Sequence, residues 1–322
     1  MLAASALLAA SGHLRPSKLP WLQASFLALQ AFSSLCQSID FVNILYPAQK
    51  SAGYAFVMGG NMRITIELIN QDGQTLFAES GENCVNLVMD HVYQPGDAVR
   101  IQACAGAHLR IRIDAAVSEG LVYLPEGTMI YQIPHGEALT AYAPQAFAGS
   151  RHLIAVRRAA DYALKSYRDV ALNPLDLPEG SGAFPHVSAN AETRGESVFA
   201  ARNVIDGMLA NHSHGEWPYE SWGVDIQFDP KITLEFGRPV TVNAMGICLR
   251  ADFPHDSWWT QATLVLSDGT EQVFYLDKTD AVQHIEIGEH TICWARIENW
   301  VKKDEPAEFP ALIEWEMYGR EA

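Results

Sequence analysis

Residues 200–237 read AARNVIDGMLANHSHGEWPYESWGVDIQFDPKITLEFG. The stretch contains two histidines, three tryptophan or tyrosine residues and a strand-like segment that ends in Leu-Glu-Phe-Gly. Its Asn, Gly and Pro residues favour turns over a helix. The mixture is typical of a loop at the end of a β-sandwich, where polar and aromatic side chains form a binding surface.

The chain before this stretch shows a strand pattern. Over residues 63–70 isoleucine and leucine alternate with polar residues, and Asp72-Gly73 then supplies a hairpin turn. Further short strands are expected at residues 75–79, 84–89, 98–103, 108–114, 121–124, 128–133 and 138–142. Their number and spacing predict an antiparallel sandwich.

A linker and a second β-rich region follow. The composition of residues 156–170 predicts a helix, which the Pro- and Gly-containing segment 173–182 cannot continue. Asp268-Gly269 predicts a hairpin turn in the second region. Strands are expected there at residues 231–236, 241–249, 261–266, 271–276, 283–287, 291–298 and 313–318.

The predicted fold class is therefore all-β, with two antiparallel β-sandwich domains joined by a short helix. Residues 62–155 form the first sandwich, 156–182 the helix and linker, and 183–322 the second sandwich. Residues 1–61 are expected to be a non-native or disordered N-terminal extension.

Composition and net charge restrict the classes of protein and of binding partner. The chain has 322 residues, of which 48% are hydrophobic and 19% charged, as in a soluble globular protein of two domains. The net charge of −16, with no cluster of Lys and Arg, argues against a nucleic-acid partner.

The first 61 residues differ from the rest, with Asp40 as their one acid. No basic residue precedes the apolar residues 2–10, as a signal peptide would require. Residues 21–35 are shorter than the roughly 20 apolar residues of a membrane span. Gly-Gly-Asn before Met62 is compatible with a purine-rich ribosome-binding sequence. We therefore predict Met62 as the genuine start, no membrane span and a cytoplasmic location.

The cysteines show neither a CxxC pair nor metal-ligand spacing. Two of them, Cys248 and Cys293, lie in apolar strand-like runs and are predicted to be buried thiols.

Four motifs, in order, carry a family resemblance: Ala201-Arg202-Asn203-Val204-Ile205-Asp206-Gly207, Trp222, Leu234-Glu235-Phe236-Gly237 and Glu316-Met317-Tyr318-Gly319. Residues 168–322 resemble the discoidin or coagulation factor V/VIII C-type domain, a galactose-binding-like jelly roll also used by bacterial carbohydrate-binding modules. The whole chain is similar to bacterial carbohydrate-binding proteins. The resemblance implies a non-catalytic protein that recognises a glycan or small sugar through loops of its second sandwich.

Two loops, residues 211–219 and 250–259, have side chains suited to sugar recognition: aromatic rings for stacking and polar groups for hydroxyls. The resemblance adds that the family commonly has a sugar-binding arginine at the strand end where Arg250 lies. The candidate ligand-binding residues are His212, His214, Glu216, Trp217, Tyr219, Arg250, Asp252, His255 and Trp258.

Some aromatic residues have a second interpretation. Trp222 and Trp259 are expected in the core. For Trp217, Tyr219 and Trp258, a core role and a binding role are both open.

The family often holds a structural calcium ion between its Asp-Gly loop and a late glutamate. The resemblance therefore implies calcium bound by Asp206, Glu316 and nearby carbonyl oxygens. Alternatively, Asp206 caps a turn and Glu316 meets a surface cation.

Three alternatives to simple glycan binding remain open from the sequence. His212, His214 and Glu216 could bind a metal ion. Glu216, with His255 and Asp252 or Asp256, could act as the general acid and base of a glycan hydrolase. The same loops could instead bind another protein.

Overall fold

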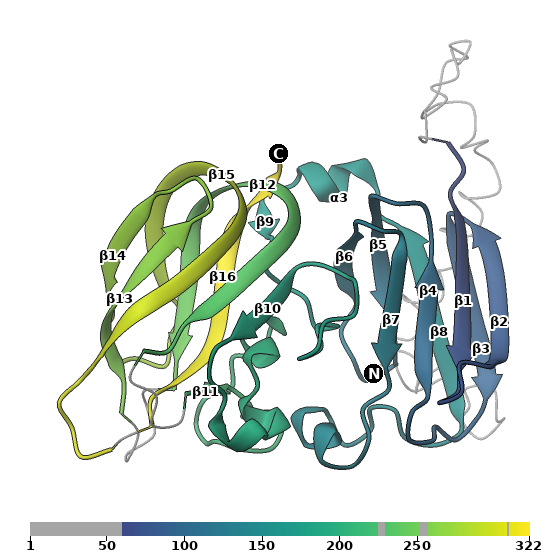
Figure 1. The fold of residues 1–322 in the computed structure, drawn as a ribbon, viewed down its shortest axis with the longest axis horizontal. Coiled ribbons are helices and arrows are strands. Elements are labelled where there is room, and N and C mark those ends of the chain that lie inside the picture. Colours follow the sequence, from purple (N-terminus) through teal and green to yellow (C-terminus); the bar gives the residue numbers. More distant parts are fainter. Residues whose placement is uncertain (1–59, 225–228, 251–256, 308) are drawn as a thin grey trace, which may run out of the picture. The chain divides into compact units, whose positions relative to one another are not determined.

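The structure is a computed structural model that describes residues 60–224, 229–250, 257–307 and 309–322. Residues 60–322 form one compact unit with two hydrophobic cores, each enclosed by β-strands (Figure 1). Every strand pair in the described residues is antiparallel. The predicted all-β class is confirmed. The predictions for residues 1–59 lie outside the described residues.

The N-terminal sandwich consists of two four-stranded sheets, with strand orders β2-β1-β4-β7 and β3-β8-β5-β6. Its strands are β1 (Arg63–Ile69), β2 (Thr75–Glu82), β3 (Cys84–Asp90), β4 (Ala98–Gln102), β5 (Ala107–Arg112), β6 (Gly120–Leu124), β7 (Thr128–Gln132) and β8 (Arg151–Arg158). The predicted alternation in β1 is confirmed, because Ile64, Ile66 and Leu68 are fully buried between the sheets. Gly73 adopts φ 76° in the predicted hairpin turn.

The C-terminal sandwich is built from an eight-stranded sheet with main strand order β11-β16-β12-β15-β13-β14. Off this path, β9 pairs with β16 and β10 pairs with β12. The strands are β9 (Arg168–Asp169), β10 (His186–Ala189), β11 (Trp222–Gly223), β12 (Ile232–Leu249), β13 (Trp259–Leu266), β14 (Glu271–Tyr275), β15 (Gln283–Lys302) and β16 (Ala311–Glu321). Short helices lie between strands along the chain: η2 (Gly136–Ala141) between β7 and β8, α3 (Asp161–Lys165) between β8 and β9, and η3 (Thr193–Gly195), η4 (Ser197–Phe199) and η5 (Ala201–Ile205) between β10 and β11.

The long strands β12 and β15 curve, so that one sheet encloses a core (Figure 1). In β12 the side chains that belong to the core cluster are at even positions up to Val242 and at odd positions from Met245. A register shift between Val242 and Ala244 causes this change, because an extra residue reverses the side on which later side chains lie. Both halves of β12 thus contribute to one core.

Buried tryptophans fill much of that core. Trp222 and Trp315 are fully buried and Trp259 is 2% exposed, and the Trp222 and Trp259 rings stack with centroids 6.1 Å apart. The predicted core role of Trp222 and Trp259 is confirmed. All four motifs of the resemblance lie in this sandwich or in the η5 turn packed against it.

Two local predictions are wrong. The helix covers only Asp161–Lys165, because residues 151–158 form β8, which pairs with β3 and β5. Sheet pairing and the burial of Ile154 and Val156 outweigh helix propensity there. The predicted strand at 138–142 is largely the helix η2.

The cysteine prediction holds in part. Cys248 is buried as predicted, whereas Cys293 is exposed on β15. An apolar neighbourhood in the sequence does not show which face of a strand a residue occupies.

A cluster of charged residues joins the two sandwiches at the end of β16. The Glu321 carboxylate accepts two hydrogen bonds from Arg238, at 2.7 and 2.8 Å, and one from Arg168 at 2.7 Å. His108 of the N-terminal sandwich lies 3.3 Å from the same carboxylate. Glu321 therefore links β5, β9 and β12 at the junction.

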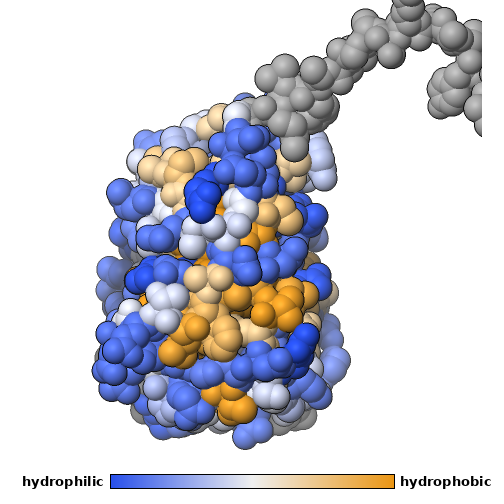
Figure 2. All heavy atoms as spheres, turned by 90° about the vertical axis from the view of Figure 1, so that its right-hand side faces the viewer, coloured by the Kyte–Doolittle hydropathy of each residue, from blue (hydrophilic) through white to orange (hydrophobic). Residues whose placement is uncertain are grey.

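Apolar side chains also gather on the surface of the N-terminal sandwich (Figure 2). Val88 and Leu153, cross-strand partners in β3 and β8, are 53% and 43% exposed. None of the helices in the described residues is long and apolar enough to cross a membrane.

Candidate functional site

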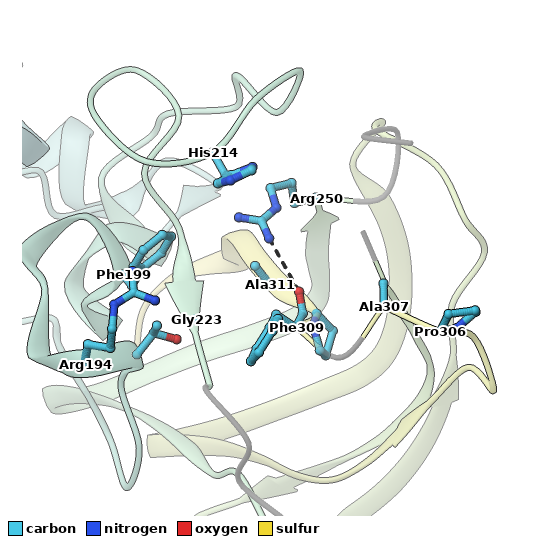
Figure 3. Close-up of a pocket in the computed structure, with 11 residues that line it drawn as sticks. Arg194, Phe199, His214, Gly223, Arg250, Pro306, Ala307, Phe309 and Ala311 are labelled. Atoms are coloured by element: carbon cyan, nitrogen blue, oxygen red, sulfur yellow. Dashed lines mark hydrogen bonds between the residues drawn. The ribbon is translucent and has the colours of Figure 1, made fainter. Parts of the chain in front are cut away.

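A hollow lies among the loops at one end of the C-terminal sandwich (Figure 3), and we call it the loop-end hollow. Its volume is about 460 Å³. The residues that line it are Thr193, Arg194, Phe199, His214, Gly223, Arg250, Pro306, Ala307, Phe309, Pro310 and Ala311. They come from four separate segments of the chain, which the sheet brings together.

Arg250 is held in place by backbone contacts. It follows the last residue of β12, and its N–H donates to the carbonyl of Ala311 at 3.2 Å. Its Nη2 lies 3.4 Å from the carbonyl oxygen of Phe309, the contact dashed in Figure 3. The residue is only 5% exposed, yet its guanidinium lines the hollow. A buried and anchored guanidinium is a fixed fork of donors.

An exposed ring lies beside this arginine. Phe309 is 49% exposed, which is unusual for a phenylalanine. Figure 3 shows Arg250 and His214 on one side of the hollow and Arg194 and Phe199 on another, with Phe309 below Arg250 in this view. The hollow thus combines polar donors with an accessible aromatic face.

Contacts among side chains also hold the wall of the loop-end hollow that lies opposite Arg250. The Arg194 guanidinium forms a double hydrogen bond with Glu196 and lies 5.6 Å from the centre of the Phe199 ring. Gly223 lets β11 approach this wall, because a Cβ there would lie 2.6 Å from Oγ1 of Thr193. A larger residue would therefore displace the wall.

A second, smaller hollow lies at the junction of the two sandwiches, and we call it the junction hollow. Its volume is about 50 Å³. Ala116, Val117, Ser118, Ala141, Tyr142, Ala143, Pro174, Arg202, Asp206, Met208, Trp217 and Glu220 line it. The Arg202 guanidinium lies 4.8 Å from the centre of the Tyr142 ring and 3.9 Å from Oδ2 of Asp206.

The carboxyl groups here are strongly affected by burial. Burial raises the pKa of Asp206 to about 6, against the effect of Arg202. Burial, and then the charge of Asp206, raises the pKa of Glu220 to about 7. Burial and the same aspartate raise the pKa of Glu314 well above its usual value.

The structure separates the predicted ligand residues into groups. His214 and Arg250 lie together at the loop-end hollow, whereas Trp217 lines the junction hollow with Asp206. His212 and Glu216 are exposed, Tyr219 is half-buried, and these three line neither hollow. Trp258 packs against the core of the C-terminal sandwich. Asp252, His255 and Asp256 lie outside the described residues.

The sequence reasoning missed Phe309, Arg194 and Phe199. Phe309 stands in a Pro-rich segment far along the chain from Arg250. The pairing of Leu249 with Leu312 brings the two residues together, and no local pattern reports that pairing.

Of the two predicted calcium ligands, Asp206 accepts a hydrogen bond from the Met208 N–H, whereas Glu316 accepts one from the Tyr318 hydroxyl. Glu314, not Glu316, accepts from the N–H of Gly207. In the described part of the chain, no three His, Cys, Asp or Glu side chains are close enough to hold a metal ion. Calcium binding by Asp206, Glu316 and nearby carbonyl oxygens stays a prediction.

No protein-family model and no curated protein matches the chain. Solved structures are similar to it over about half of its length. The chitosan-binding module 1 derived from a chitosanase/glucanase of Paenibacillus sp. IK-5 is 17% identical, with 48% of this chain and 100% of that chain covered and a TM-score of 0.33.

The family 32 CBM from C. perfringens NanJ, solved with galactose, is 16% identical, with 41% and 91% covered and a TM-score of 0.32. A Streptococcus pneumoniae fucose binding module is 12% identical, with 48% and 99% covered and a TM-score of 0.34. These similarities concern the fold alone.

Proposed function

We propose that this protein binds a glycan, without catalysis, in the loop-end hollow of its C-terminal sandwich. One observation carries the proposal: the anchored guanidinium of Arg250 and the exposed ring of Phe309 line the same hollow. The resemblance of residues 168–322 to the discoidin domain, read from the sequence, supports the same function.

The chemistry of the hollow suits a sugar. A pyranose has a face of C–H groups that packs on an aromatic ring, and hydroxyls around its edge that hydrogen-bond to donors and acceptors. Phe309 supplies the ring, while Arg250 and His214 supply polar groups for hydroxyls. The volume of about 460 Å³ falls within the range of small-molecule sites.

We favour glycan binding over glycan hydrolysis because of the residue types that line the loop-end hollow. A glycoside hydrolase of the usual kind needs two carboxyl groups across the scissile bond. The described residues that line the hollow include no Asp or Glu. Glu216, which the sequence suggested as one member of an acid–base group, lines neither hollow.

A glycan array that includes β-galactosides and acidic glycans tests the proposal, followed by calorimetry with the best array ligand. Phe309→Ala removes an exposed ring and leaves the core intact, so we expect binding about tenfold weaker with an unchanged melting temperature. Arg250→Lys keeps the charge but loses the fork, and we expect a comparable loss.

Tyr275→Ala is the matched control. Tyr275 is 74% exposed on β14 and lines neither hollow, so its removal should leave affinity unchanged. Failure to bind any glycan on the array overturns the proposal and leaves protein binding by the same loops. If neither Phe309→Ala nor Arg250→Lys changes the glycan affinity, the glycan site lies elsewhere on the protein.

A further inference from the structure

We propose that the junction hollow is a second ligand site, which takes the terminal ammonium group of a primary alkylamine between Glu220, Asp206 and Trp217. The site is separate from the loop-end hollow and does not depend on the proposed glycan binding. Trp217 and His214 belong to the same loop, yet they line different hollows.

The first reason is a buried carboxylate oxygen that lacks a partner. Glu220 is only 2% exposed, lines the hollow, and its Oε2 has no hydrogen-bond partner in the described residues. A buried carboxylate oxygen without a donor is costly, and an ammonium group supplies three donors and the opposite charge.

The second reason is the balance of charge around the hollow. Two of its lining residues, Asp206 and Glu220, are acidic, and Arg202 is the one cation among them. Arg202 is already engaged: its Nε donates to the carbonyl of Asp176 at 2.9 Å, and its Nη1 donates to Asn203 at 3.1 Å. Its closest approach to a carboxylate of the hollow is to Asp206. When both carboxyl groups are ionised, the residues that line the hollow carry one more negative than positive charge.

The third reason is the shape and lining of the hollow. About 50 Å³ accommodates a few non-hydrogen atoms, whereas a pyranose ring is too large. Apart from its charged residues, the wall is largely apolar and aromatic, with Trp217 half-buried at its side. An indole ring attracts a cation to its face, and small apolar side chains suit the methylene groups behind an ammonium. The lining therefore fits the end of an aminoalkyl chain.

Calorimetry of the full-length protein with n-butylammonium chloride tests the proposal, with n-butanol as a neutral probe of similar size. We expect saturable binding of the amine and none of the alcohol. Glu220→Gln preserves the shape of the side chain but removes its charge, and should weaken amine binding at least about tenfold. Trp217→Ala should also weaken it.

The matched control is Glu271→Gln, an exposed glutamate on β14 that lines neither hollow; its affinity for the amine should equal that of the unmodified protein. Melting curves establish that each variant folds. Lysine Nα-acetyl amide and spermidine then distinguish the source of the ammonium group. Tighter binding of the lysine derivative indicates a peptide side chain, and tighter binding of spermidine indicates a polyamine. Either result supports the proposal.

Three results overturn the proposal. The first is no saturable binding of the amine, and the second is amine binding that Glu220→Gln leaves unchanged. The third is calcium binding that displaces the amine and is lost in Asp206→Asn, because that result assigns the hollow to the metal predicted from the sequence.

Discussion

Replacing Glu321 by glutamine should destabilise the whole described unit, because Glu321 joins the two sandwiches. Its side chain is 16% exposed and receives hydrogen bonds from Arg238 and Arg168. Glutamine retains one acceptor but removes the charge that these arginines face. Breaking a buried ion pair costs about 3–5 kcal/mol, so for this largely buried group we expect a loss of about 2–3 kcal/mol.

The effect should depend on pH in a defined direction. Burial works to raise the pKa of Glu321, but His108, Arg238 and Arg168 outweigh it and hold the pKa well below its usual value. A carboxylate with a lowered pKa stabilises the folded state above its unfolded pKa of about 4.3, and this contribution is lost as the pH falls. The difference between the native protein and Glu321→Gln should therefore be large near pH 7 and shrink below about pH 4.

Urea unfolding of the full-length protein at several pH values measures both effects, and melting curves should show a fall of roughly 5–10 °C at neutral pH. Asp90→Asn is the control, because the Asp90–Arg151 pair is largely exposed and should contribute little. A loss below about 0.5 kcal/mol at neutral pH, or one that does not change with pH, refutes the reasoning.

Three further substitutions have definite expected outcomes. Gly223→Ala should push Thr193 out of the wall of the loop-end hollow and weaken glycan binding severalfold in calorimetry; unchanged affinity would remove this wall from the site. Gly237→Ala should lower the melting temperature, because Gly237 has φ 67° and a Cβ there would lie within 2.7 Å of the Phe184 ring. Trp222→Ala should cost about 3–5 kcal/mol in urea unfolding, since Trp222 is fully buried; a loss under about 1 kcal/mol would contradict its role in the core.

The sequence predicts the strands well where local chemistry decides them. Alternation in residues 63–70 and the Asp-Gly turns depend on side chains a few positions apart, and the structure confirms both. The helix at 156–170 was wrong because β8 is determined by its pairing with β3 and β5, which come from distant segments. Likewise Gly237 resembles the end of a strand, but β12 continues through it with a change of register.

The residues of the candidate site also differ in whether the sequence could predict them. The family resemblance predicted Arg250 at a strand end, the composition of a polar loop predicted His214, and both residues line the loop-end hollow. Phe309 could not be found, because its exposure next to Arg250 depends on the pairing of β12 with β16. The different surroundings of Trp217 and His214 follow from how the two sandwiches pack, which no local pattern records.

A crystal structure of the full-length protein with the best glycan from the array tests the proposed glycan site most sharply. We expect a sugar ring in the loop-end hollow, stacked on Phe309 and hydrogen-bonded to the guanidinium of Arg250. A glycan bound elsewhere on the protein, with this hollow filled only by solvent, would show that the loop-end hollow is not the glycan site.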